Sequence, residues 1–221
     1  DITKEPIPVV PAAQARVSLL DNGFMFGDGV YETLRTYDGR PFALGAHLIR
    51  LRASAERLGI AIPFDDRELA KRVETLLARA DHGESYLRIV VTRGVGDVSY
   101  HFERVQGPTI VMVVKPLETL AASDYERGIA LATVSVRRNS PQALDPAIKS
   151  VNLLNNILAV REAQGRGASE ALLLNERGEV AEGASSNIFL ARAGALLTPP
   201  LAAGILAGIT RAVVLEQADE L

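Results

Sequence analysis

Apolar residues recur along the chain at two different spacings, which together predict a mixture of helices and strands. Leu48, Leu51, Ala55 and Leu58 are three to four residues apart and predict a helix over residues 46–58. Similar spacing predicts helices over residues 66–80, 153–164 and 209–220. Alternating or continuous apolar runs predict strands over residues 16–20, 30–37, 85–92, 108–114, 128–136, 170–174, 179–182 and 187–191. The pattern therefore favours an α+β fold.

A polar stretch with a proline, residues 115–124, divides these elements into two groups. We expect a small N-terminal α/β domain over residues 1–115, a linker over residues 116–124 and a larger domain over residues 125–221. The last predicted helix reaches the end of the sequence without a capping residue. We therefore expect that further residues follow Leu221 in the natural protein and that the second domain is incomplete here.

Composition narrows the classes of function. The chain has 221 residues, a net charge of −3 and 48% hydrophobic residues, so it can form a large core and lacks the basic charge of a nucleic-acid-binding protein. It contains no cysteine, and its three histidines do not have metal-ligand spacing. No apolar run is long enough to span a membrane. We expect a cytoplasmic protein with no metal, nucleic-acid or membrane partner.

Two residues suggest a specific chemistry. Lys149 follows Asp-Pro-Ala-Ile, and desolvation in such surroundings can lower the pKa of a lysine enough for it to form a Schiff base. Glu182 stands beside small and hydroxyl residues and can keep a ring nitrogen protonated. Together they suit an aldehyde cofactor with a pyridine ring and a phosphate. A lysine that reaches to water and a glutamate in a solvated turn are the simpler alternatives.

Three further features fit such a cofactor. Gly208, Ile209 and Thr210 open a helix, where free N–H groups favour a phosphate, although many helices begin this way. Arg50 can bind a phosphate with its planar guanidinium, or it can be an ordinary surface charge. Tyr86 and Arg88 lie on one face of a strand, where the arginine can bind a substrate carboxylate or an internal acid.

Six short motifs in this order resemble the class IV pyridoxal-phosphate aminotransferases, also called fold type IV. They are Gly-Asp-Gly-Val-Tyr-Glu (27–32), His-Leu-Ile-Arg-Leu (47–51), Tyr-Leu-Arg-Ile-Val-Val-Thr-Arg-Gly (86–94), Ile-Lys-Ser-Val-Asn-Leu-Leu-Asn-Asn (148–156), Glu-Gly-Ala-Ser-Ser-Asn (182–187) and Gly-Ile-Leu-Ala-Gly-Ile-Thr-Arg (204–211). The resemblance extends from about residue 15 to the last residue. It implies the family's two-domain fold, with a small α/β domain and a larger pseudo-barrel domain.

The resemblance also implies a role for each matching residue. Lys149 would form the Schiff base with pyridoxal 5'-phosphate and shuttle the proton, and Glu182 would pair with the pyridine nitrogen. Arg50, the amides of Ile209 and Thr210, and the Ser186 hydroxyl would bind the phosphate, while Leu206 and Ser185 would lie near the two faces of the ring. The residues expected to line the substrate pocket are Phe26, Tyr31, Thr33, Arg35, Tyr86 and Arg88.

Within the family, the motifs favour different members. Tyr86, Arg88 and Arg35 resemble the branched-chain enzymes, whereas Leu154 and the Lys-Ser-Val-Asn-Leu-Leu motif resemble the D-amino-acid enzymes. The latter carry an arginine and a histidine after Thr-Arg-Gly, where this chain has only His101. We therefore favour transfer of an amino group from a branched-chain L-amino acid to a 2-oxo acid such as 2-oxoglutarate, by a homodimer. A D-amino-acid aminotransferase, an aminodeoxychorismate lyase and an inert cofactor-binding homologue remain alternatives, and Arg88 argues against an amine transaminase.

Overall fold

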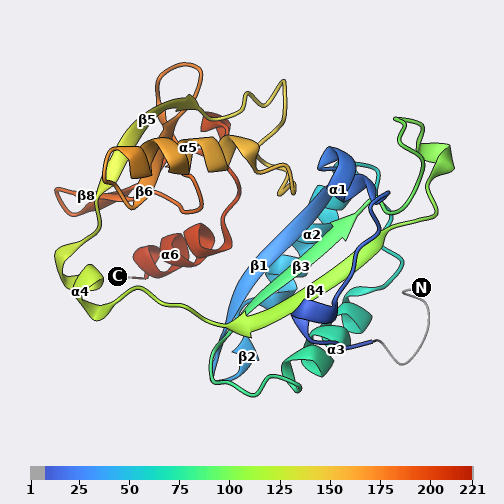
Figure 1. Cartoon of the computed structure of the whole chain (residues 1–221). Helices are drawn as coiled ribbons and strands as arrows, with labels where there is room; N and C mark the ends of the chain where they lie inside the picture. Colours follow the sequence, from blue (N-terminus) through green and yellow to red (C-terminus); the bar gives the residue numbers. More distant parts are fainter. Residues whose placement is uncertain (1–7, 221) are drawn as a thin grey trace. The chain divides into compact units, whose positions relative to one another are not determined.

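The computed structural model describes residues 8–220, which form two compact units (Figure 1). Unit 1 contains the described residues up to Glu118 and, in addition, the later segment Ile148–Asn152. Unit 2 contains Thr119–Ala147 and the described residues from Leu153 onwards. The first boundary falls within the predicted linker over residues 116–124, and the segment that carries Lys149 belongs to unit 1.

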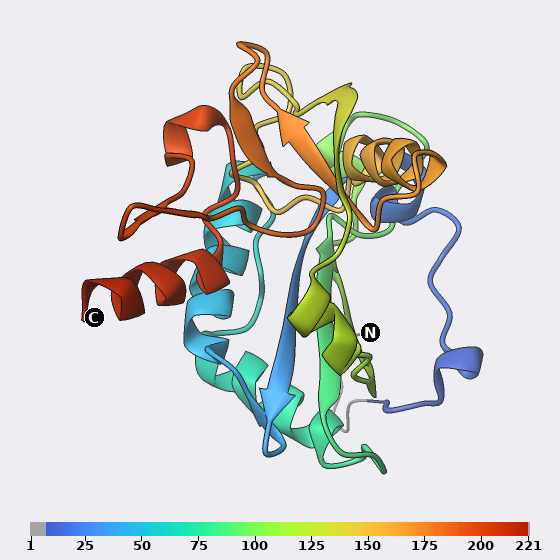
Figure 2. The ribbon, with the colours of Figure 1, turned by 90° about the vertical axis from the view of Figure 1, so that its left-hand side faces the viewer.

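Unit 1 is an antiparallel sheet with two helices on one face, as Figures 1 and 2 show. The strands are in the order β2-β1-β3-β4, and neighbouring strands are antiparallel. Its elements are η1 (Ala12–Gln14), α1 (Asn22–Phe26), β1 (Gly29–Tyr37), β2 (Arg40–Pro41), α2 (Leu44–Arg57), α3 (Asp66–Leu77), β3 (Ser85–Thr92), η2 (Phe102–Arg104) and β4 (Thr109–Pro116). The hairpin between β1 and β2 turns at Asp38 and Gly39, whose φ angles of 50° and 71° suit a tight two-residue turn.

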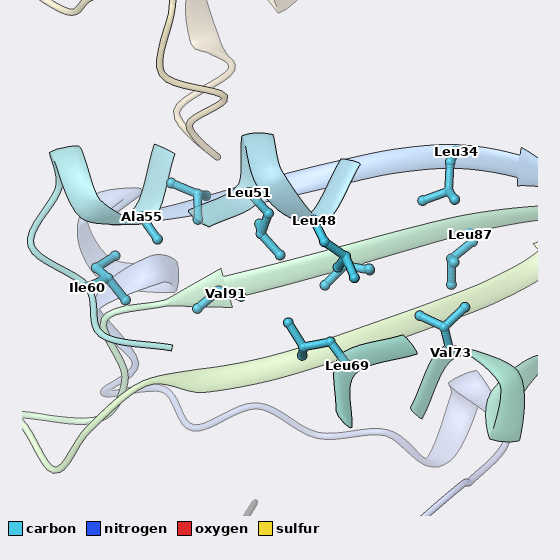
Figure 3. Close-up of a cluster of buried hydrophobic side chains, with 11 residues drawn as sticks. Leu34, Leu48, Leu51, Ala55, Ile60, Leu69, Val73, Leu87 and Val91 are labelled. Atoms are coloured by element: carbon cyan, nitrogen blue, oxygen red, sulfur yellow. The ribbon is translucent and has the colours of Figure 1, made fainter. Parts of the chain in front are cut away.

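The core of unit 1 lies between the sheet and its two helices (Figure 3). Leu48, Leu51 and Ala55 project from α2 toward the strands, and Leu69 and Val73 project from α3. Every second residue of β1 and β3 faces this core; these residues include Val30, Leu34, Leu87, Ile89 and Val91. The helices predicted around residues 46–58 and 66–80 are therefore confirmed, and Leu48, Leu51, Ala55 and Leu58 of the first face the core as their spacing predicts. The other face of the sheet carries both polar side chains, such as those of Thr33 and Arg88, and the apolar side chains of Val90 and Val113.

Unit 2 has shorter strands and is connected differently. β5 and β6 are parallel, β7 is antiparallel to β6, and β8 and β9 form a separate hairpin. Its elements are α4 (Ala122–Arg127), β5 (Leu131–Arg137), α5 (Leu154–Gly165), β6 (Glu170–Leu174), β7 (Val180–Gly183), β8 (Leu190–Arg192), β9 (Ala195–Leu197), η3 (Leu201–Ala203) and α6 (Ile209–Asp219). Its largest buried cluster consists of Val134, Ala159, Ala163, Ala168, Ala171, Leu173 and Ala184.

The strand predicted over residues 16–20 is wrong, because residues 15–18 have no regular structure and residues 19–20 form a turn. These residues are exposed, so apolar spacing alone did not place them in a sheet. The short helix α1 follows instead, and its N-terminus is capped by Asp21, whose side chain accepts a hydrogen bond from the Gly23 amide. The strand predicted over residues 187–191 starts only at Leu190.

None of the helices within residues 8–220 combines the length and apolar character needed to cross a bilayer. In the same part of the chain, no three side chains of the metal-binding types are grouped so that they can hold an ion.

Candidate active site

Lys149 lies in the segment of unit 1 that runs beside β1. Ser150 forms an antiparallel bridge with Val30, and the Tyr31 amide donates a hydrogen bond of 2.9 Å to the Lys149 carbonyl. The Lys149 amide donates to the Ser54 hydroxyl of α2 at 3.2 Å. Both backbone polar groups of the lysine are therefore held by unit 1.

The amine of Lys149 lies over an aromatic ring that it shares with a second cation. Its Nζ atom is 4.6 Å from the centroid of the Tyr31 ring, and Arg88 Cζ is 4.1 Å from the same centroid. Both distances fall within the range of cation–π interactions. The side chains of Lys149 and Arg88 therefore both lie close to the ring of Tyr31.

Five of the six predicted substrate-binding residues lie on the same face of the sheet. In the β1–β3 register, Thr33 is opposite Arg88 and Arg35 is opposite Tyr86, while Tyr31 shares their face through period-two alternation. The Thr33 and Tyr86 hydroxyls are 3.5 Å apart. This face is the one opposite the helices. Tyr86 and Arg88 do share a face, as alternation predicts.

The sixth predicted residue, Phe26, lies at the end of α1. Its ring packs at 5.3 Å from the ring of Tyr100, in the loop that follows β3. The described contacts therefore group Phe26 with this loop, whereas the other five residues belong to the sheet.

The pKa values of Tyr31 and Tyr86, on this face of the sheet, shift in opposite directions. Burial raises the pKa of the Tyr31 phenol, although the charge of Arg88 acts in the other direction. Burial also acts to raise the pKa of Tyr86, but hydrogen bonds with Thr33 and Arg88 outweigh it and lower that pKa. Tyr31 thus stays protonated at neutral pH and can donate a hydrogen bond.

Arg50 lies against a buried carboxylate on the core side of the sheet. Its Nε and one terminal nitrogen each donate a 2.7 Å hydrogen bond to an oxygen of Glu32, which has no exposed surface. His47 Nδ1 lies 2.7 Å from the same carboxylate. Burial acts to raise the pKa of Glu32, but the hydrogen bonds from Arg50 and His47 outweigh it and lower the pKa.

Sequence reasoning missed Glu32 and His47, although alternation along β1 gave a usable signal. Glu32 stands between Tyr31 and Thr33, so period-two spacing places it with Val30 and Leu34 on the core face. A carboxylate on that face requires a cation, and Arg50 on the neighbouring helix supplies one.

In unit 2, Glu182 is a buried carboxylate at the end of β7, with a side chain that is 7% exposed. Arg138 Nε donates to its Oε1 atom at 2.7 Å. The backbone amide of Leu206 donates to its Oε2 atom at 3.1 Å. Sequence reasoning missed Arg138, whose only signal was its place in the pair Arg137-Arg138 that follows the strand predicted over residues 128–136.

Ser185 and Ser186 lie in the loop that follows Glu182, called the serine loop below. Both hydroxyls lie within hydrogen-bonding distance of Glu170 Oε2, at 3.2 Å and 3.0 Å. A Cβ atom at Gly183 would come within 2.2 Å of the Ser186 hydroxyl and 3.2 Å of the Ser186 carbonyl oxygen, so the loop folds back closely on Gly183. The two serines are therefore positioned by the carboxylate of β6.

The N-terminus of α6 supplies the remaining predicted residues of unit 2. Ile209 and Thr210 begin the helix, and its N-cap, Gly208, provides no side-chain hydrogen bond to them. A Cβ atom at Gly208 would come within 2.2 Å of the Asn187 side chain, so the helix start and the serine loop are in close contact. The first amides of α6, with the positive end of the helix dipole, can bind an anion.

The predicted residues thus fall into two groups, one in each unit. Unit 1 carries Arg50, Lys149 and the substrate-facing residues of the sheet. Unit 2 carries Glu182, Ser185, Ser186, Leu206, Ile209 and Thr210.

The sequence profile of the amino-transferase class IV family matches residues 29–221. The chain belongs to this family. A protein of Methanocaldococcus jannaschii, provisionally named as a branched-chain-amino-acid aminotransferase, is 43% identical over 96% of this chain and 72% of its own length. The aminodeoxychorismate lyase of Bacillus subtilis is 34% identical over 94% of this chain and 70% of its own length. The D-alanine aminotransferase of Bacillus licheniformis is 33% identical over 94% and 71%, respectively.

Solved structures confirm the fold of this class IV aminotransferase. The branched-chain aminotransferase of Thermoproteus uzoniensis, crystallised with norvaline, matches 96% of this chain and 72% of its own, with a TM-score of 0.86 and 34% identity. The T.th. branched-chain aminotransferase, complexed with N-(5'-phosphopyridoxyl)-L-glutamate, matches 96% and 70% with a TM-score of 0.87 and 29% identity. The family and the fold type IV architecture inferred from the sequence motifs are therefore both confirmed.

Proposed function

We propose that this class IV aminotransferase uses pyridoxal 5'-phosphate to move an amino group from a branched-chain L-amino acid to a 2-oxo acid. The observation that carries the proposal is the Lys149 amine, anchored to β1 and placed over Tyr31 beside Arg88. The phosphopyridoxyl compound bound by the T.th. relative supports the choice of cofactor.

The residues present fit this cofactor. It needs an amine, an acid for its ring nitrogen and a site for its phosphate. The chain offers Lys149, the buried carboxylate of Glu182 and the α6 N-terminus, which has no side-chain cap. In our proposal the amides of Ile209 and Thr210, the Ser186 hydroxyl and Arg50 bind the phosphate, while Leu206 and Ser185 adjoin the ring. Arg50 also binds Glu32, so that contact would fix the orientation of its guanidinium.

When bound, the cofactor condenses its aldehyde with an amine and accepts the electrons released as the substrate α-proton leaves. Lys149 Nζ would take the α-proton from the amino acid and would deliver it to the carbon that the cofactor aldehyde supplies. Glu182 keeps the ring nitrogen charged. Tyr31, whose pKa is raised by burial, stays protonated and orients the substrate through its hydroxyl.

The sheet face in unit 1 suits the two substrates of this exchange. Arg88 is available for the second carboxylate of 2-oxoglutarate, because its described contacts are with the Tyr31 ring and with Tyr86 rather than with an acid. Val90 and Val113 share this face through the strand register and can pack against an aliphatic side chain. Thr33 and Arg35 complete the polar part of this face, and Phe26 stays a predicted pocket residue.

The first test concerns the lysine. The chain has four lysines, and borohydride reduction of the holoenzyme should fix the cofactor mass only on the peptide that contains Lys149. Lys149→Ala should abolish turnover and this labelling. Lys115→Ala is the matched control, because Lys115 also lies over a tyrosine of the same sheet, 5.3 Å from the Tyr86 centroid. Labelling at another lysine would refute the proposal.

The second test concerns the substrate. Half-reactions with L-leucine and D-alanine, followed by cofactor absorbance, should be faster with L-leucine. Faster reaction with D-alanine would identify a D-amino-acid aminotransferase, and release of pyruvate from aminodeoxychorismate would identify a lyase; relatives of both kinds exist. Arg88→Met should raise the KM for 2-oxoglutarate more than that for a monocarboxylic 2-oxo acid.

The homodimer stays a prediction based on the family resemblance, and the cytoplasmic location stays a prediction based on the sequence pattern. Sedimentation equilibrium of the holoenzyme measures the first, and cell fractionation measures the second. A monomer with full activity would contradict the predicted dimer.

A further inference from the structure

Among the described residues of unit 2, one ion pair is almost completely buried on both sides. The side chains of Arg138 and Glu182 are 10% and 7% exposed, and Nε and Oε1 are 2.7 Å apart. The other ion pairs described in unit 2 are more exposed; for example, Arg166 and Arg177 are each more than half exposed. A buried charge is costly unless it is paired, so each member of this pair requires the other.

Arg138 is itself held in place from two other elements. One of its terminal nitrogens donates to Asn155 Oδ1 of α5 at 3.1 Å, and the Asn155 amide donates to the Arg137 carbonyl at 2.8 Å. The backbone amide of Arg138 donates to the Leu174 carbonyl of β6 at 2.9 Å. The guanidinium therefore approaches Glu182 from a fixed direction.

The two oxygens of Glu182 have different donors. Arg138 occupies Oε1, and the Leu206 amide occupies Oε2. This arrangement fixes the plane of the carboxylate. We propose that Arg138 is a positioning residue of this enzyme, which keeps Glu182 ionised and oriented toward the ring nitrogen of the cofactor; this inference rests on the proposed function.

The physical reason lies in the state of the carboxylate. Without a cation, a carboxylate at this depth gains stability by taking up a proton or by turning toward water. In either case it no longer holds a charged ring nitrogen, and the α-proton becomes harder to remove. Arg138 prevents both outcomes without contacting the substrate.

A double-mutant cycle on the holoenzyme tests this inference. The variants are Arg138→Gln, Glu182→Gln and the combination, with Arg138→Lys as the conservative variant. The readouts are the absorption spectrum of the bound cofactor and the single-turnover rate of α-proton removal, measured with α-deuterated L-leucine. Arg166→Gln is the matched control, because it removes an Arg–Glu contact of the same unit that does not involve Glu182.

We expect Arg138→Gln to slow proton removal roughly 10- to 100-fold, as is common for groups that orient functional ligands. Arg138→Gln should also shift the cofactor spectrum in the same direction as Glu182→Gln does. Arg138→Lys should restore part of the rate and part of the spectrum. In the Glu182→Gln background, Arg138→Gln should change the rate by less than about 2-fold, because its effect passes through that carboxylate. Arg166→Gln should leave the spectrum unchanged.

The inference would be overturned if removing Arg138 slowed proton removal equally in the wild-type and the Glu182→Gln backgrounds. A residue with a merely structural role would act independently of Glu182. If Arg138→Gln alone does not fold, Glu182→Gln and the double variant still show the effect of removing Arg138, because neither contains the buried Glu182 carboxylate. If Glu182→Gln itself changes neither spectrum nor rate, the role of Glu182 in the proposed function fails instead.

Discussion

The two units hold their functional side chains in different ways. The main core of unit 1 has one alanine among eleven buried residues, and the rest are leucine, isoleucine and valine. The largest cluster of unit 2 has five alanines among seven. In unit 1, regular strand alternation on a large apolar core positions Tyr31 and Arg88. In unit 2, side-chain hydrogen bonds position Glu182 and the serine loop.

The contrast has a physical consequence. Large side chains bury much apolar area, so the shape of unit 1 is stabilised mainly by burial. Alanines bury little area but allow helix and sheet to approach closely. The stability of unit 2 therefore depends more on close packing, which leaves no room for larger side chains, and on polar contacts. Unit 1 also contains a polar network beside its apolar core, formed by Glu32, His47 and Arg50.

The largest effect in this comparison of the two units is expected from disrupting the polar network of unit 1. Glu32→Gln removes the fully buried carboxylate that binds Arg50, whose side chain is 13% exposed, and we expect a loss of about 3–5 kcal/mol in the free energy of unfolding. Urea denaturation measures it. The control is Glu118→Gln, which removes an exposed carboxylate that lies 3.3 Å from Lys115. A loss below about 1 kcal/mol, the usual value of exposed pairs, would show that the network adds little.

The next test concerns the large side chains of unit 1. Leu87→Ala shortens a fully buried side chain of β3, the strand between β1 and β4. It should lower the free energy of unfolding by about 2–5 kcal/mol through lost burial and a cavity. Leu19→Ala, at a residue of the same type that is 69% exposed, is the control and should cost far less. Equal losses would mean that the described core is not the source of stability.

The close packing of unit 2 predicts the opposite kind of sensitivity. Ala171→Val adds two methyl groups at a fully buried position of β6 and should destabilise by about 1–3 kcal/mol through overpacking. Ala130→Val, at an exposed position, should be nearly neutral. Thermal unfolding of both variants measures the difference, and a stabilised Ala171→Val protein would contradict close packing.

A smaller effect is expected at a helix end in unit 1. Asp65 caps α3 by accepting a hydrogen bond of 2.7 Å from the Glu68 amide, and Asp65→Ala should cost about 0.5–2 kcal/mol. Asp81→Ala, whose carboxylate is fully exposed, is the control. If the two variants unfold at the same denaturant concentration, the cap contributes nothing measurable.

The smallest expected effect is a pH dependence. The pKa of Glu32 is lower in the folded protein than its ordinary value of 4.5. The contribution of this carboxylate is therefore complete above the unfolded pKa and is lost as the pH falls through the lower folded pKa. The stability difference between the wild type and Glu32→Gln should stay constant from pH 7 to about 5 and shrink below it. A difference that grows on acidification would contradict this sign.

Much of unit 1 could be predicted because its information is local. The helices around Leu51 and Val73 and the strand that carries Tyr86 and Arg88 are encoded by spacing within a few residues. The failed strand over residues 16–20 has the same spacing but no neighbouring strand. Local spacing therefore predicts where a strand can form, but the strand forms only where the fold supplies a neighbouring strand.

The sequence by itself determined the family, through six collinear motifs. It also determined those helices and strands whose apolar residues recur regularly within a few positions. Only the tertiary structure decided which charged groups meet. Arg138 and Glu182 are 44 positions apart, and the amide of Lys149 and Ser54 are 95 positions apart. Periodicity describes which face a side chain occupies, but a buried charge finds its partner across the fold. These pairings therefore arise only when distant strands, helices and loops have packed together.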